Sequence, residues 1–155
     1  MRNFRASEKF KGIVEKLAQS NHPVAERSIF PTIRDLLCFV AVLGFEYDRN
    51  KAISDKSYDI VDGRIMSNNQ QTIDLLYLIS LAHSKDVEIL REENEGKMID
   101  IFEEYAQGGF EIIEGWLNEK PDDLNGDKAI LAAFSKYNFL NAPVDAEDAT
   151  RKVSF

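Results

Sequence analysis

The run from Ile33 to Leu43 constrains the fold of this chain more than any other segment. It is apolar on nearly every side apart from two charged residues in its first turn. A helix that is apolar almost all round has to be buried, so the run predicts a central helix. Pro31 and Thr32 precede it as a helix start with Thr32 as the cap, and Gly44 follows it as a C-terminal stop.

Apolar residues at helical spacing predict several more helices. The predicted helices run from Ser7 to about Ser20, from Thr72 to about His83, from Lys97 to Ala106, from Phe110 to Leu117, and onward from a cap at Asp127. Asn68 or Asn69 is placed to cap the second of these. Gly108-Gly109 separates two of them, which indicates either a helix break or a close helix crossing made possible by the missing β-carbons.

Residues 45–71 are polar and lack this periodicity. Within them, Tyr58–Val61 and Arg64–Met66 resemble two short strands joined by a type I′ turn at Asp62-Gly63, and the alternative is an extended loop, because an isolated hairpin is marginally stable. We therefore predict a mainly α fold, a compact bundle of about five or six helices with a small β-hairpin around residues 58–66.

A chain of 155 residues, 44% hydrophobic and 30% charged, is typical of one globular domain. We expect residues 1–140 to form a single helical domain and residues 141–155 a flexible C-terminal tail. No run approaches the roughly 18 apolar residues of a membrane span, and no secretory signal is recognisable. The single cysteine, Cys38, lies in an apolar run, which favours a buried thiol and a cytoplasmic location.

The charge is divided unevenly along the chain. The net charge is −8, but residues 1–64 carry eleven basic and nine acidic residues, whereas residues 65–155 carry eight basic and eighteen acidic ones. Between Asp86 and Asp127 there are fourteen acids and three bases. Such a segment is either a well-solvated helical face or a surface for a basic partner.

The residues predict no catalytic, cofactor or metal site. His22 and His83 lack the helical partner that a zinc site needs, and the clustered acids match no calcium loop or di-iron motif. A solvated acidic face is the simpler interpretation of those acids. The sequence therefore favours a binding role over an enzyme.

Two segments carry a family resemblance. They are Ser28-Ile-Phe-Pro-Thr-Ile-Arg-Asp-Leu-Leu-Cys-Phe-Val-Ala-Val-Leu-Gly-Phe-Glu-Tyr-Asp-Arg and Ile101-Phe-Glu-Glu-Tyr-Ala-Gln-Gly-Gly-Phe-Glu-Ile-Ile. Over roughly residues 5–120 the chain resembles the Dnd (DNA phosphorothioation) system-associated protein 4 family, and the Phe-Glu-Glu-Tyr-Ala-x-Gly-Gly block is the most specific part. The resemblance implies a place beside DNA sulfur modification and its linked restriction, in defence against foreign DNA such as phage. It supplies no catalytic residue.

Three hypotheses follow from charge and resemblance together. In the first, the protein is a non-catalytic accessory that binds other proteins of the modification and restriction system. Its partner-binding residues would be Glu103, Glu104, Glu111 and Glu114. In the second, it is a DNA-binding regulator or sensor. Its DNA-binding residues would be Arg2, Arg5, Lys9 and Lys11. In the third, the acids hold a metal ion for a nuclease. Homo-oligomerisation stays open, and no cofactor or membrane partner is expected.

Overall fold

The computed structural model describes residues 1–137, and this part of the chain contains six α-helices and one two-stranded antiparallel sheet. The helices are α1 (Lys11–Val14), α2 (Ile33–Glu46), α3 (Gly63–Ser67), α4 (Gln70–Ser84), α5 (Glu95–Asn118) and α6 (Asp127–Lys136). The strands are β1 (Phe4–Ser7) and β2 (Ser57–Val61). The predicted mainly α class with a small sheet is confirmed. The predicted tail, residues 141–155, lies outside the described residues.

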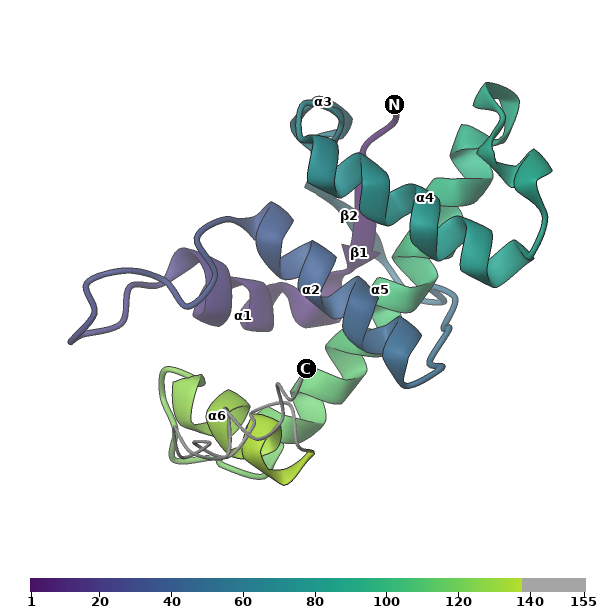
Figure 1. The fold of residues 1–155 in the computed structure, drawn as a ribbon. Coiled ribbons are helices and arrows are strands. Elements are labelled where there is room, and N and C mark those ends of the chain that lie inside the picture. Colours follow the sequence, from purple (N-terminus) through teal and green to yellow (C-terminus); the bar gives the residue numbers. More distant parts are fainter. Residues whose placement is uncertain (138–155) are drawn as a thin grey trace, which may run out of the picture.

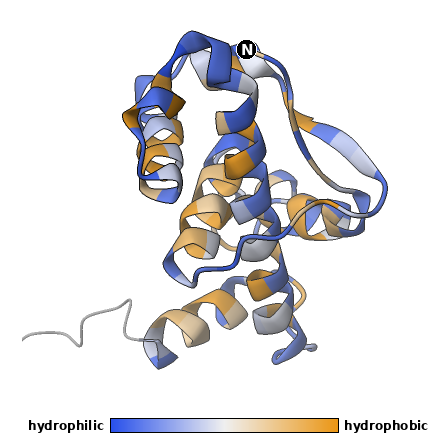
Figure 2. Ribbon diagram, turned by 90° about the vertical axis from the view of Figure 1, so that its right-hand side faces the viewer, coloured by the Kyte–Doolittle hydropathy of each residue, from blue (hydrophilic) through white to orange (hydrophobic). Residues whose placement is uncertain are grey.

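The long helix α5 is the axis on which the other elements pack (Figure 1). Its 24 residues span roughly 36 Å at the usual rise of an α-helix. The predicted central helix α2 crosses it, α4 packs beside it, and α6 lies near its C-terminal end. In Figure 2 hydrophobic and hydrophilic residues alternate along the helical ribbons, as expected of amphipathic helices around a shared core.

Two phenylalanines of the N-terminal segment anchor it to α5. Phe4 meets Phe102 edge-on at 5.5 Å between ring centroids, and Phe10 stacks on Phe110 at 5.1 Å. All four side chains are fully buried. Aromatic pairs of this kind contribute large buried areas to a core, so the first ten residues are part of the folded body.

The predicted strand around Tyr58–Val61 is present, but its predicted partner is wrong. β2 pairs with β1 in antiparallel register, with Arg5 opposite Asp59 and Ser7 opposite Ser57. Residues 64–66 lie instead in α3, because the Asp62 side chain accepts a hydrogen bond from the backbone of Arg64 (2.8 Å) and caps a helix there. An Asp that could open a type I′ turn can equally well cap a helix.

The predicted helix starts at Ser7, Thr32 and Asn69 are confirmed. Each of these side chains accepts a backbone hydrogen bond from the first turn that follows it. The segment after Ser7 is irregular, with a 3-10 turn at Glu8–Phe10, then α1, then a π-helical turn at Glu15–Gln19. The prediction for Asp127 is wrong: Gly126 occupies the cap position, and the buried Asp123 accepts the hydrogen bond from the backbone of Ala129 (2.9 Å).

Gly44 does not end α2, which continues to Glu46. A β-carbon at Gly44 would overlap the backbone carbonyl of Tyr105 in α5. The glycine is therefore required by the close approach of two helices, and the prediction that it ends the helix is wrong.

Within residues 1–137, no helix combines the length and the apolar character needed to cross a membrane.

Candidate functional site

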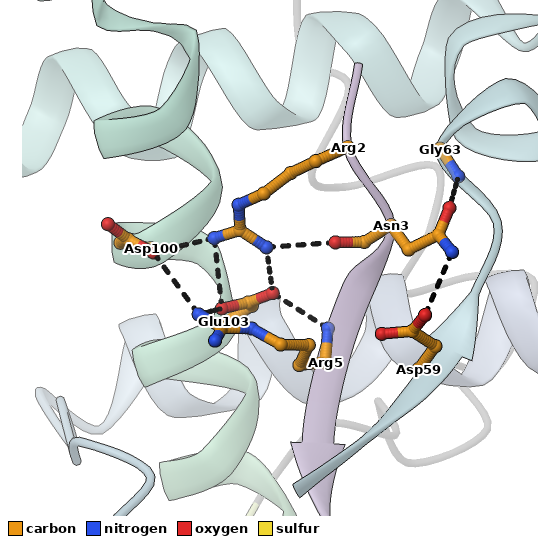
Figure 3. Close-up of polar contacts among 7 residues, drawn as sticks. All are labelled: Arg2, Asn3, Arg5, Asp59, Gly63, Asp100 and Glu103. Atoms are coloured by element: carbon orange, nitrogen blue, oxygen red, sulfur yellow. Dashed lines mark hydrogen bonds and ion pairs between the residues drawn. The ribbon is translucent and has the colours of Figure 1, made fainter.

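The most concentrated polar cluster joins the two sets of residues that the sequence predicted for separate roles. Glu103 on α5 is 3% exposed and accepts hydrogen bonds from Arg2 Nη1 (2.6 Å) and from the backbone nitrogen of Arg5 (2.7 Å). The Arg5 guanidinium lies 3.3 Å from the other carboxylate oxygen. Asp100, one helical turn earlier, binds Arg2 Nη2 at 2.6 Å (Figure 3). Two predicted DNA-binding arginines and one predicted partner-binding glutamate thus satisfy one another.

The rest of the N-terminal segment extends this cluster. The terminal ammonium of Met1 lies 3.4 Å from Glu95, so α5 binds basic groups of the first five residues at three points along its N-terminal half. Asn3 joins the strands from the other side, donating to Asp59 (2.9 Å) and accepting from the backbone of Gly63 (3.1 Å) (Figure 3). Burial lowers the pKa of Arg2, but the adjacent carboxylates of Glu103 and Asp100 outweigh it and raise that pKa above its ordinary value. Met1 and Arg2 therefore fasten the chain terminus to α5, and Asn3 fastens it to β2 and α3.

Tyr105, Gly108 and Gly109 of the Phe-Glu-Glu-Tyr-Ala-x-Gly-Gly block have architectural roles. Tyr105 is 5% exposed, and its hydroxyl lies 2.9 Å from His83 Nδ1. β-carbons at Gly108 and Gly109 would overlap the backbone carbonyls of Arg49 and Val40. α5 runs through both glycines without interruption, so the predicted alternative of a helix break is wrong and that of a close helix crossing is confirmed.

The other predicted partner-binding residues divide into two groups along α5. Glu104 is half-buried and lines a cleft of about 230 Å³ together with Arg5, Ser57 and Asp100. Glu111 and Glu114 lie two to three turns further on. Gln107 lies between the two groups on the same side of the helix, but it is 3% exposed. The predicted acidic surface is therefore interrupted at its middle.

The predicted DNA-binding lysines make weaker contacts than the arginines. Lys9 Nζ lies 3.9 Å from Glu111 and 4.9 Å from the centroid of the Phe10 ring. Lys11 lies 3.4 Å from Glu8, and its ammonium is placed over the ring of Tyr58. All four basic residues lie near carboxylates of the chain itself, and Arg5 and Lys9 are exposed to the same degree (47% and 46%), so they do not form one unpaired basic patch.

The side chains singled out for reactivity have structural surroundings. His22 Nε2 lies 3.1 Å from Asp127, while its Nδ1 accepts from the backbone nitrogens of Val24 and Ala25. Cys38 is half-buried against Thr72, and burial raises the pKa of its thiol. In residues 1–137, no three His, Cys, Asp or Glu side chains are arranged to hold a metal ion.

Sequence reasoning missed that Asp100 acts together with Glu103. Their spacing of three residues places them on neighbouring positions of one helical face, which was a usable signal. Nothing local indicated that the basic groups facing them would come from the chain terminus, about a hundred residues away in sequence (101 between Arg2 and Glu103).

Comparison with protein families matches residues 3–149 to DNA sulphur modification system-associated protein 4. Searches of curated proteins and of solved structures found no match. The family match spans nearly the whole chain and includes both the N-terminal strand and the glycine crossing of α5. The chain therefore belongs to the DNA sulphur modification system-associated protein 4 family.

Proposed function

We propose that this chain is a non-catalytic accessory protein of its DNA sulphur modification system and binds a basic segment of another protein of that system. Within the described residues, the observation that carries the proposal is the unpaired carboxylate of Glu104. It lines the cleft beside the arginine cluster, yet within residues 1–137 no ion pair is formed with it, while its neighbour Glu103 is fully engaged. We further propose that the role serves restriction of foreign DNA, including phage DNA, in the cytoplasm.

The charges around the cleft favour a basic ligand. Arg2 and Arg5 are shared between Asp100 and Glu103, and Glu104 adds a third carboxylate. One lysine or arginine side chain from a partner would balance this excess. The cleft volume of about 230 Å³ is below the roughly 300–1,000 Å³ of small-molecule sites. It suits a single inserted side chain better than a free metabolite.

Glu111 and Glu114 provide a second contact in this proposal. At the rise of an α-helix they lie roughly 10–15 Å beyond Glu104 along α5. A partner segment with basic residues at that separation would reach both groups and pass over the covered Gln107. Glu103 lines the same cleft, but its carboxylate is already paired with Arg2 and Arg5, so we assign it to holding the chain terminus and not to the partner.

Direct DNA binding through the N-terminal residues is the weaker alternative. The guanidinium groups of Arg2 and Arg5 are within 2.6–3.6 Å of carboxylates on α5 and would have to leave them to bind phosphates. The chain also carries a net charge of −8, which repels a DNA backbone. The same negative charge attracts a basic protein partner.

Co-purification from the native operon tests the proposal. The tag belongs at the C-terminus, because the terminal ammonium of Met1 is paired with Glu95. We expect the wild type to retain a basic protein of the system at low salt and to lose it as salt screens the contact. Glu104→Lys should abolish retention. Glu119→Lys, an equal charge change on an exposed acid just beyond the end of α5, is the matched control and should leave it intact.

Recovery of the wild type as a lone protein at both low and moderate salt would refute the proposal. Retention that survives Glu104→Lys but is lost in a Glu111→Lys, Glu114→Lys double variant would move the contact to the second acidic group. Co-purifying DNA that is removed by nuclease treatment, with no protein left behind, would favour the DNA-binding alternative.

A further inference from the structure

A groove runs between residues 9–20, here called the α1 segment, and the C-terminal end of α5. Along α5 it lies beyond Gln107 from the acidic cleft. It consists of two adjoining clefts, of about 460 and 250 Å³, which share Gly12 and Lys16. The larger cleft has basic walls formed by Lys9, Lys16 and Lys120. Its apolar wall is formed by Ile13, Leu117 and Pro121.

Three lysines gather along this groove. They line the larger cleft together with Glu114, and Glu15 lines the smaller cleft. Lys9 also lies 3.9 Å from Glu111, so Lys16 and Lys120 are the lysines on which the inference depends. Within residues 1–137, Lys16 and Lys120 form no salt bridge. Lysine ammonium groups grouped in this way are typical ligands of phosphate.

Gly12 lines both clefts and has open space around it. A β-carbon there would have no atom within 4 Å, whereas those at Gly44, Gly108 and Gly109 would strike backbone. Glycine weakens a helix relative to alanine, and no packing constraint accounts for it at this position. The π-helical turn Glu15–Gln19, which follows α1, carries Lys16 into both clefts. Turns of this type are rare and occur often at functional sites.

We propose that this groove binds the phosphate group of a nucleotide-sized ligand. Lys9, Lys16 and Lys120 neutralise the phosphate, and the apolar wall of Ile13, Leu117 and Pro121 contacts the less polar part of the ligand. The volume of the larger cleft, about 460 Å³, falls within the roughly 300–1,000 Å³ of small-molecule sites. A free nucleotide and the end of an oligonucleotide share this chemistry, and the acidity of the remaining surface favours the smaller of the two. The inference does not rest on the cleft at Glu104, although Glu114 both lines this groove and belongs to the proposed second contact with a partner.

Titration of the full chain, followed by amide NMR shifts, tests this inference. The probes are inorganic pyrophosphate, adenosine 5′-monophosphate and a short single-stranded oligonucleotide. We expect shifts confined to the α1 segment and the end of α5, with affinity falling as salt is added. A Lys16→Gln, Lys120→Gln double variant should bind at least about tenfold more weakly, because two phosphate contacts are lost. The matched control is Lys85→Gln, Lys97→Gln, which removes equal charge elsewhere.

A steric variant provides the second arm. Gly12→Gln should fill the groove and prevent binding, while Gly12→Ala adds only the β-carbon for which there is room and should bind as the wild type does. Thermal unfolding establishes that each variant is folded. If the Gly12→Gln variant does not fold, the lysine variants alone test whether the groove binds phosphate. Binding of the nucleotide alone assigns the site to free nucleotides, and binding of the oligonucleotide alone assigns it to nucleic-acid ends. No shift with any probe, or equal binding by the Lys16→Gln, Lys120→Gln variant, overturns the inference.

Discussion

The two halves of α5 resemble each other in sequence and differ in what they bind within the chain. Both are acidic outside and apolar inside, and Gly108-Gly109 lies between them. The N-terminal half is fastened by basic groups from the chain terminus, which contact Glu95, Asp100 and Glu103. The C-terminal half faces a lysine-lined groove. A run of like charges in sequence therefore does not describe one surface, since its members can be neutralised from the opposite end of the chain.

The largest expected loss of stability comes from a substitution at the boundary between the two halves of α5. Gly109→Ala should destabilise the protein by about 3 kcal/mol or more, because its β-carbon overlaps the carbonyl of Val40 and forces α2 away from α5. Gly115→Ala, later on the same helix with open space around it, should be neutral or should stabilise by up to about 1 kcal/mol. Urea unfolding of both variants provides the comparison. Equal effects would show that the glycines do not mark a tight crossing.

The second-largest expected loss of stability distinguishes Glu103 from Glu104 in the N-terminal half of α5. Glu103→Gln should cost about 2 kcal/mol, since it removes the buried charge that binds Arg2 and Arg5. Glu104→Gln should change the free energy of unfolding by less than about 0.5 kcal/mol, as is usual for a residue without such a network. Chemical denaturation at neutral pH measures both. A stability loss at Glu104 equal to that at Glu103 would remove the distinction between them.

A smaller effect concerns the connection from the C-terminal half of α5 to α6. Asp123→Ala should cost about 1 kcal/mol, because the hydrogen bond to the backbone of Ala129 is lost. Burial acts to raise the pKa of Asp123, but backbone hydrogen bonds from Ala129, Gly126 and Asn125 outweigh it and lower that pKa below 3.8.

The sign of the pH dependence follows from that lowered pKa. Ionised Asp123 stabilises the folded state above its unfolded pKa, and this contribution is lost as the pH falls through the lower folded value. The stability difference between wild type and Asp123→Ala should therefore be constant near neutral pH and shrink below pH 3.8. Unfolding curves collected down the pH scale test this. A difference that grew on acidification would contradict the assigned hydrogen bonds.

The parts of the fold that were predictable have local causes. Ser7, Thr32 and Asn69 cap helices through hydrogen bonds that span only a few residues, and most of the apolar run of α2 is buried, although Val42 is 43% exposed. Gly44 was misinterpreted because its purpose depends on Tyr105, which lies in another helix. Sequence periodicity contains no information about such a contact.

The candidate site was predictable only as separate pieces. The acids of α5 and the basic residues of the N-terminus were both identified, but their pairing depends on β1 and β2, two short strands about fifty residues apart whose pairing leaves no local pattern. Lys16 and Lys120 are likewise brought to one groove by tertiary packing alone. Charges that are distant in sequence can be assigned to a surface only when their neighbours in space are known.

We propose separate roles for two adjacent glutamates of α5, with Glu103 holding the chain terminus and Glu104 binding a partner. The most direct test compares Glu103→Gln and Glu104→Lys in co-purification from the native operon, normalised to the amount of folded protein. We expect Glu103→Gln to lower stability and retain the partner, and Glu104→Lys to remain stable and lose it. Loss of the partner in Glu103→Gln together with full retention in Glu104→Lys would contradict these separate roles.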